Sequence, residues 1–147
     1  MEMAGSENTN EELSKLTFWR VVFQIDAPPP NVVGLDLRGP SIVGHITLTT
    51  EERPDLDLSP YGASVNGISR RHAVLLPQDD GVFLIDLSST NGTWVNGEFL
   101  EPGSKHSLRR DDVLELGHLQ MIVRVVEQVV VTYDQGFGTT VSRSKPQ

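Results

Sequence analysis

The 147-residue sequence contains no cysteine. Disulfide scaffolds and thiolate zinc sites are therefore excluded, and a reducing compartment is allowed. No apolar run approaches the roughly 18 residues that a membrane-spanning helix requires, and the N-terminus has no basic region followed by an apolar stretch. We expect a soluble, cytoplasmic protein.

Basic residues are also scarce. Twelve lysines and arginines stand against 20 aspartates and glutamates, so the formal net charge is -8. General binders of nucleic acid or of anionic membranes need a broad basic face. The charge therefore predicts no nucleic-acid partner and no membrane partner, and any anion site must be confined to a few residues. At 147 residues the chain has room for one domain with a real core, and its 37% of hydrophobic residues is adequate for that core.

No segment of helix length shows the 3.6-residue periodicity of an amphipathic helix. Short β-branched, aromatic or alternating runs recur instead every 8 to 12 residues or so, with turn signals such as Asn96-Gly97 between them. The pattern predicts an all-β, antiparallel β-sandwich of about 10 to 11 strands. We expect strands at residues 16–25, 31–37, 41–44, 55–58, 73–76, 82–86, 93–95, 98–101, 106–108, 113–116 and 119–126. The segment 127–133 should extend the strand at 119–126 or pair with an edge of a sheet.

The two ends of the chain differ in composition from this domain. Residues 1–14 are polar and acidic, and residues 134–147 are rich in glycine and hydroxyl groups. Such segments bury too little apolar surface to become ordered, so we expect flexible tails on either side of a domain at 15–133. One hypothesis for the C-terminal tail is that Thr139 and Thr140 become phosphorylated and fold back onto a pocket of the same domain.

Two polar, glycine-punctuated segments flank a pair of expected strands. They read Gly67-Ile-Ser-Arg-Arg-His-Ala73 and Asp86-Leu-Ser-Ser-Thr-Asn-Gly-Thr-Trp-Val-Asn-Gly97, and a tight turn at 79–81 joins the strands between them. The two loops should therefore meet at one edge of a sheet. The loops supply hydroxyls, a guanidinium and an amide but no obvious general base, from Ser69, Arg70, Ser89, Thr90 and Asn91. Such a set of groups suits binding an oxyanion better than cleaving a bond.

These motifs resemble the forkhead-associated (FHA) domain, a phosphothreonine-peptide-binding β-sandwich. The likeness extends over residues 38–126 and takes in Gly44, the segment 55–58 and the segment 111–117. It implies an adaptor in signal transduction that reads the products of Ser/Thr kinases. Its partners would be a Thr-phosphorylated protein or peptide and the Ser/Thr kinase itself.

The resemblance also implies roles for single residues. Ser69 and Arg70 would contact the phosphate, because hydroxyl and guanidinium donors form charge-assisted hydrogen bonds with it. Thr90 would help to enclose the phosphorylated side chain, and Asn91 would fix the peptide main chain through its amide group. His72 would be a buried structural residue that holds the two loops together.

The glycines at the site are expected to be structural, and the residue after one of them departs from the family pattern. Gly44 and Gly92 would meet backbone requirements. His45 stands where the family usually has an arginine that is a principal phosphate ligand. A neutral imidazole offers one N–H donor and no charge, so a contact worth roughly 1.5 to 3 kcal/mol is missing. We keep His45 among the peptide-binding residues and expect weakened or pH-modulated binding.

Two other functions compete with this interpretation. The first is a degenerate FHA sandwich that acts as a phospho-independent protein-interaction or assembly module. The second is a hydrolase built on Ser69, His72 and Asp86. We reject it because residues three apart that enter a strand do not bring a hydroxyl onto an imidazole edge with a third group behind it. The protein is therefore not expected to be an enzyme.

The remaining candidate residues are given no role in chemistry. The histidines at positions 45, 72, 106 and 118 show no metal-ligand spacing, so neither a metal nor a cofactor is expected. Arg71 would point away from Arg70 if the chain is already extended there, and we expect it to be an exposed charge.

Overall fold

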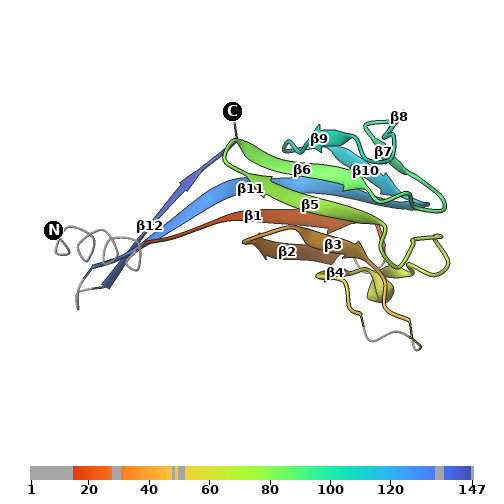
Figure 1. Cartoon of the computed structure of the whole chain (residues 1–147), viewed down its shortest axis with the longest axis horizontal. Helices are drawn as coiled ribbons and strands as arrows, with labels where there is room; N and C mark the ends of the chain where they lie inside the picture. Colours follow the sequence, from red (N-terminus) through yellow and green to blue (C-terminus); the bar gives the residue numbers. More distant parts are fainter. Residues whose placement is uncertain (1–14, 28–30, 48, 50–51, 135–137, 147) are drawn as a thin grey trace, which may run out of the picture.

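The computed structural model describes residues 15–27, 31–47, 49, 52–134 and 138–146. Within them the chain forms two β-sheets that make a sandwich, and a single 3-10 turn, η1 (Ser59–Tyr61) (Figure 1). None of the helical structure described is long and apolar enough to cross a membrane. The predicted all-β sandwich is confirmed, with strands β1 (Lys15–Ile25), β2 (Asn31–Leu37), β3 (Ser41–Gly44), β4 (Leu56–Asp57), β5 (Ala73–Gln78), β6 (Gly81–Asp86), β7 (Thr93–Val95), β8 (Glu98–Phe99), β9 (Lys105–Ser107), β10 (Val113–Leu116), β11 (Leu119–Asp134) and β12 (Gly138–Ser144).

The larger sheet has the strand order β2-β1-β11-β10-β7-β8, and β12 also pairs with β11. Strand β1 runs antiparallel to β11 from Lys15 opposite Thr132 to Ile25 opposite Met121. Strand β11 continues unbroken through the valine-rich segment 127–133, which therefore extends the last predicted strand. The hairpin β7–β8 turns at Asn96 and Gly97, which both have positive φ, as the tight hairpin turn requires.

The smaller sheet has the order β4-β3-β5-β6-β9 and is antiparallel except for the parallel pair β3–β4. Its register decides which loops lie together. Val43 near the end of β3 lies opposite Ala73 at the start of β5, and Ala73 lies opposite Asp86 at the end of β6. The loops after β3, before β5 and after β6 therefore lie together at one end of the sandwich (Figure 1).

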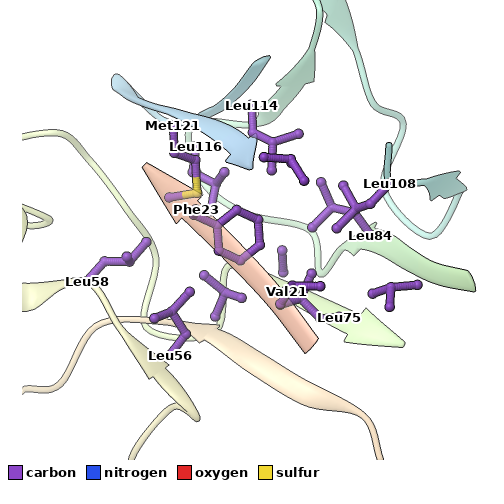
Figure 2. Packing of buried hydrophobic residues seen from close by; sticks show 14 of the residues in the cluster. Val21, Phe23, Leu56, Leu58, Leu75, Leu84, Leu108, Leu114, Leu116 and Met121 are labelled. Carbon is purple, nitrogen blue, oxygen red and sulfur yellow. The ribbon is translucent and has the colours of Figure 1, made fainter. Parts of the chain in front are cut away.

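The core lies between the sheets and follows from the alternation of apolar residues along the strands. Val21, Phe23 and Ile25 of β1 are buried, because alternate side chains of a strand share one face. Figure 2 shows Val21 and Phe23 among leucines from both sheets, including Leu75 of β5 and Leu114 of β10. Each fully buried side chain of this size stabilises the fold by about 1.5 to 3 kcal/mol.

The C-terminal segment differs from the flexible tail expected at 134–147. Residues 138–144 form β12, which pairs with β11 from Gln128 opposite Ser144 to Asp134 opposite Gly138. Because β11 runs past the end of β10, its edge would otherwise leave backbone groups unpaired, and the β-branched residues at 139–141 favour a strand. Figure 1 places β12 at the end of the molecule opposite to the clustered loops. The expected N-terminal tail, 1–14, lies outside the described residues.

Candidate functional site

A cavity of about 720 Å³ opens between the three clustered loops. Residues of the β3–β4 loop, of the segment 67–71 and of the β6–β7 loop line it. The five residues predicted to bind a peptide all lie on its wall: His45, Ser69, Arg70, Thr90 and Asn91. Sequence positions up to 46 residues apart thus meet in one site, because the β3–β5–β6 register brings their loops together.

Asp86 organises the loop that follows β6. Its buried carboxylate accepts hydrogen bonds from the Ser89 backbone N–H at 3.0 Å, from the Ser89 hydroxyl at 2.5 Å and from the Thr93 hydroxyl at 2.7 Å. The Ser89 hydroxyl in turn accepts from the Gly92 N–H at 3.1 Å. Burial alone raises the pKa of Asp86, but the bonds from Ser89 and Thr93 outweigh it and hold the pKa below its ordinary value. The loop is therefore built around a carboxylate that is negatively charged at neutral pH.

His72 joins the loop at 67–71 to the loop after β6 from inside the protein, where it is fully buried. Its Nδ1 accepts a hydrogen bond of 3.0 Å from the Ser69 N–H, so Nε2 carries the proton. Nε2 donates to the Gly92 carbonyl at 3.0 Å and also lies 3.1 Å from the Thr93 hydroxyl. Burial lowers the pKa of His72, and the Gly92 bond and the Asp86 charge offset this only in part. The ring is neutral at pH 7, and neither nitrogen bonds the Ser69 hydroxyl.

Two further contacts tie the loops together at the cavity wall. The Ser69 hydroxyl accepts a hydrogen bond of 3.0 Å from the Thr90 N–H, which leaves its own hydrogen to donate. The Asn91 side-chain nitrogen donates to the Gly67 carbonyl at 2.9 Å. Asn91 keeps its amide oxygen and a second N–H for other partners. Ser69 and Asn91 thus each use one polar group to hold the loops together and keep another that can bind a ligand.

Gly44 lets the backbone of the Arg70 loop approach β3. A Cβ at this position would lie 1.8 Å from the Arg70 carbonyl oxygen and 3.0 Å from that of Ser69. Both neighbours are backbone atoms, so no side-chain rotation could relieve the overlap. Glycine is required here by space, since its φ is not in the positive range. At Gly92 a positive φ of 85° adds a conformational requirement.

His45 lies on the cavity wall, but its ring is turned partly to its own chain. Its Nδ1 is 3.1 Å from the Ile46 carbonyl oxygen, which can only accept. Nδ1 therefore carries a proton, and in the neutral ring Nε2 has a lone pair instead of a donor. In that tautomer His45 offers an anion neither charge nor a second N–H.

Two arginines on the cavity wall were not predicted as site residues. Arg53 comes from the β3–β4 loop, in a segment whose sequence shows only polarity. Arg71 is exposed, as expected, but it also lines the cavity and lies 3.9 Å from the Glu52 carboxylate. Only the folded arrangement of the loops reveals either position. In the described ranges, no group of three or more metal-ligating side chains lies together.

Known proteins share both the sequence motifs and the architecture. The family model described as FHA domain matches residues 46–117. The oxoglutarate dehydrogenase inhibitor of Corynebacterium diphtheriae is 30% identical over 104 residues, which cover 66% of this chain and 68% of the inhibitor. A solved structure from work on phosphothreonine-dependent FHA domain interactions is 32% identical, covers 72% of this chain and 96% of its own, and superposes with a TM-score of 0.53. The chain belongs to the FHA domain family.

Some relatives are much longer than the shared region. Protein FraH of Nostoc sp. is 39% identical over 64 residues, which are 44% of this chain and 22% of FraH. This chain therefore spans less than a quarter of that relative. The similarity is limited to the matched region, and most of FraH lies outside it.

Proposed function

We propose that this protein binds phosphothreonine peptides and acts as an adaptor that recruits proteins phosphorylated by a Ser/Thr kinase. The observation that carries the proposal is the meeting of Ser69, Arg70, Thr90 and Asn91 on one cavity in a family of interaction modules. Arg70 forms no ion pair with any residue that the structure describes. Its positive charge is therefore available to an anion from outside.

Each side chain has a group left for the ligand. The Arg70 guanidinium would donate charge-assisted hydrogen bonds to the phosphate, and the Ser69 hydroxyl would donate its free hydrogen. Thr90 would pack beside the phosphorylated side chain. Asn91 would bind the peptide main chain through the amide oxygen and the N–H that Gly67 leaves unused. The buried Asp86 and His72 hold these loops in place without touching the ligand.

The proposal is tested by fluorescence anisotropy with a labelled degenerate peptide library that carries phosphothreonine at one fixed position. Matched libraries with unphosphorylated threonine and with phosphoserine serve as ligand controls. The protein is compared as wild type, Arg70→Ala and Arg110→Ala. Arg110 is a suitable control because it is an exposed arginine that does not line the cavity.

Phosphothreonine-selective binding that Arg70→Ala removes and Arg110→Ala retains would support the proposal. Equal binding of the phosphorylated and unphosphorylated libraries by the folded wild-type protein would contradict it. The phospho-independent interaction module would then be the better description. His45 is the observation that favours this second function, because an imidazole whose Nδ1 faces the Ile46 carbonyl stands where the resemblance implies an arginine.

A further inference from the structure

We infer that Arg53 is a second phosphate-binding residue, which with Arg70 holds one doubly charged phosphate between two guanidiniums. The inference rests on the proposed function and names the charge of the ligand that the site takes. Arg53 belongs to the β3–β4 loop and Arg70 to the loop before β5, and both line the same cavity. The two groups approach the cavity from different loops.

The β3–β4 loop is fastened at both ends, which gives Arg53 a defined place. The Asp55 carboxylate accepts a hydrogen bond of 2.7 Å from the Ile42 N–H of β3. At the other end, the Asp57 carboxylate accepts from the Ile46 N–H at 3.3 Å. Arg53 lies two residues before the Asp55 anchor. Its side chain therefore starts from backbone that is tied to the wall of the cavity.

The charges around the cavity match a phosphate dianion. Three arginines and one glutamate line it among the described residues. Arg71 lies 3.9 Å from Glu52, whereas Arg53 and Arg70 have no carboxylate within salt-bridge distance in the described part of the chain. Two unpaired positive charges remain in a chain whose net charge is -8. A phosphothreonine carries about -1.5 to -2 at pH 7, so one phosphate would neutralise both.

Arg53 also supplies the charged group that is missing at position 45. His45 directs its Nδ1–H at the Ile46 carbonyl and not at the cavity, and an imidazole cannot form the bidentate contact of a guanidinium. A phosphate held by Arg70 alone would lack a second charged partner. Arg53 supplies a guanidinium from the same β3–β4 loop, eight residues further along the chain. The β3–β4 loop therefore still supplies a positive charge to the cavity, from position 53 instead of position 45.

The test uses the labelled phosphothreonine library with the full chain as wild type, Arg53→Ala, Arg70→Ala and Arg110→Ala. Arg53→Ala is expected to weaken binding about tenfold or more, as the loss of a charge-assisted contact does. Adding His45→Arg to Arg53→Ala should restore most of that affinity, because it returns a guanidinium to the wall. The Arg53 Nε–H resonance should shift when phosphopeptide is added. Thermal unfolding checks that every variant is folded.

The outcomes separate this inference from the proposed function. Phosphate-dependent binding that Arg70→Ala removes, while Arg53→Ala behaves as Arg110→Ala does, would overturn the role of Arg53 and leave the proposed function intact. Loss of affinity in Arg53→Ala that His45→Arg fails to restore would also overturn it, since the loss would not be one of charge at the phosphate. Binding without phosphate dependence in the wild type would remove both.

Discussion

The Nδ1 atom of His72 accepts a hydrogen bond of 3.0 Å from the backbone N–H of Ser69. The same ring donates from Nε2 to the Gly92 carbonyl, 20 residues further along the chain. This buried side chain therefore helps to set the distance between the loop that carries Arg70 and the loop that carries Asn91, together with the contacts at the cavity wall. Its removal should affect stability and binding together.

Replacing His72 by alanine should lower the free energy of unfolding by about 2 to 4 kcal/mol, since it leaves the Ser69 N–H and the Gly92 carbonyl without their partner. His72→Gln can keep a donor for Gly92 and should lose less. Urea unfolding of both variants measures the difference. Wild-type stability of His72→Ala would show that water replaces the ring without cost.

His72 should also make stability depend on pH. Its pKa in the folded protein lies below the 6.5 of the unfolded chain, mainly because of burial. Below 6.5 the unfolded state binds a proton that the folded state does not, so the free energy of unfolding falls as the pH decreases through this region. The contribution is fully present above pH 6.5 and is lost toward the lower folded pKa.

The measurement is urea unfolding at pH 7.5, 6.5 and 5.5, with His72→Gln as the comparison. The stability difference between the two proteins should shrink as the pH decreases. The pKa of Asp86 is also lowered, but its effect on the free energy of unfolding is confined to pH values near and below its ordinary pKa of 3.8. A difference that is constant from pH 7.5 to 5.5 would show that His72 does not resist protonation.

Gly44→Ala should destabilise the protein by about 1 to 3 kcal/mol, the usual cost of overpacking a close contact. The added Cβ would meet the Arg70 carbonyl at 1.8 Å and push the Arg70 loop away, so phosphopeptide affinity should fall as well. Gly39→Ala is the matched control, because nothing lies within 4 Å of a Cβ there. Equal unfolding midpoints for the two variants would contradict the packing argument.

His45→Arg should tighten phosphopeptide binding in the wild-type background by less than in the Arg53→Ala background. With Arg53 present, the cavity already has two guanidiniums without an ion-pair partner among the described residues, for about two negative charges. The gain is read from anisotropy titrations of the four proteins that make up this double-mutant cycle. Weaker binding by His45→Arg would place position 45 outside the phosphate pocket.

Truncation after Asp134 should leave phosphopeptide affinity unchanged. It removes β12 with Thr139 and Thr140, and Figure 1 places that strand opposite to the cavity. Stability should decrease by only about 1 kcal/mol, since the side chains of 139–145 are exposed and little apolar surface is lost. Comparison with the kinase-treated 147-residue chain shows whether phosphorylation of the C-terminal threonines changes the affinity. Reduced affinity of the truncated protein would mean that the C-terminus reaches the site.

Much of the fold could be predicted because its signals are local. Alternation of apolar residues marked the strands, and Asn96-Gly97 marked the β7–β8 hairpin, whose two turn residues indeed have positive φ. The C-terminal strand could not be predicted in this way. The side chains of residues 139–144 are all exposed, and the strand pairs because β11 extends past β10 and offers a free edge.

The site residues also divide into those that local sequence motifs predict and those that only the folded chain reveals. Motif residues such as Ser69 and Asn91 could be predicted to share a loop cluster, because a hairpin returns the chain to the same sheet edge. Arg53 could not, since no motif marks it and only the folded β3–β4 loop, with Asp55 bonded to the Ile42 N–H, brings it to the cavity wall. The roles of these residues toward a ligand stay predictions until binding is measured.

The network around Asp86 and His72 has a consequence for the thermodynamics of recognition. Both loops are held by hydrogen bonds to buried groups, so their main chains are already restricted before a ligand arrives. Little backbone conformational entropy should then be lost on association. A short, extended peptide would contribute most of the ordering itself, and its stiffness would set the affinity more than any rearrangement of the domain.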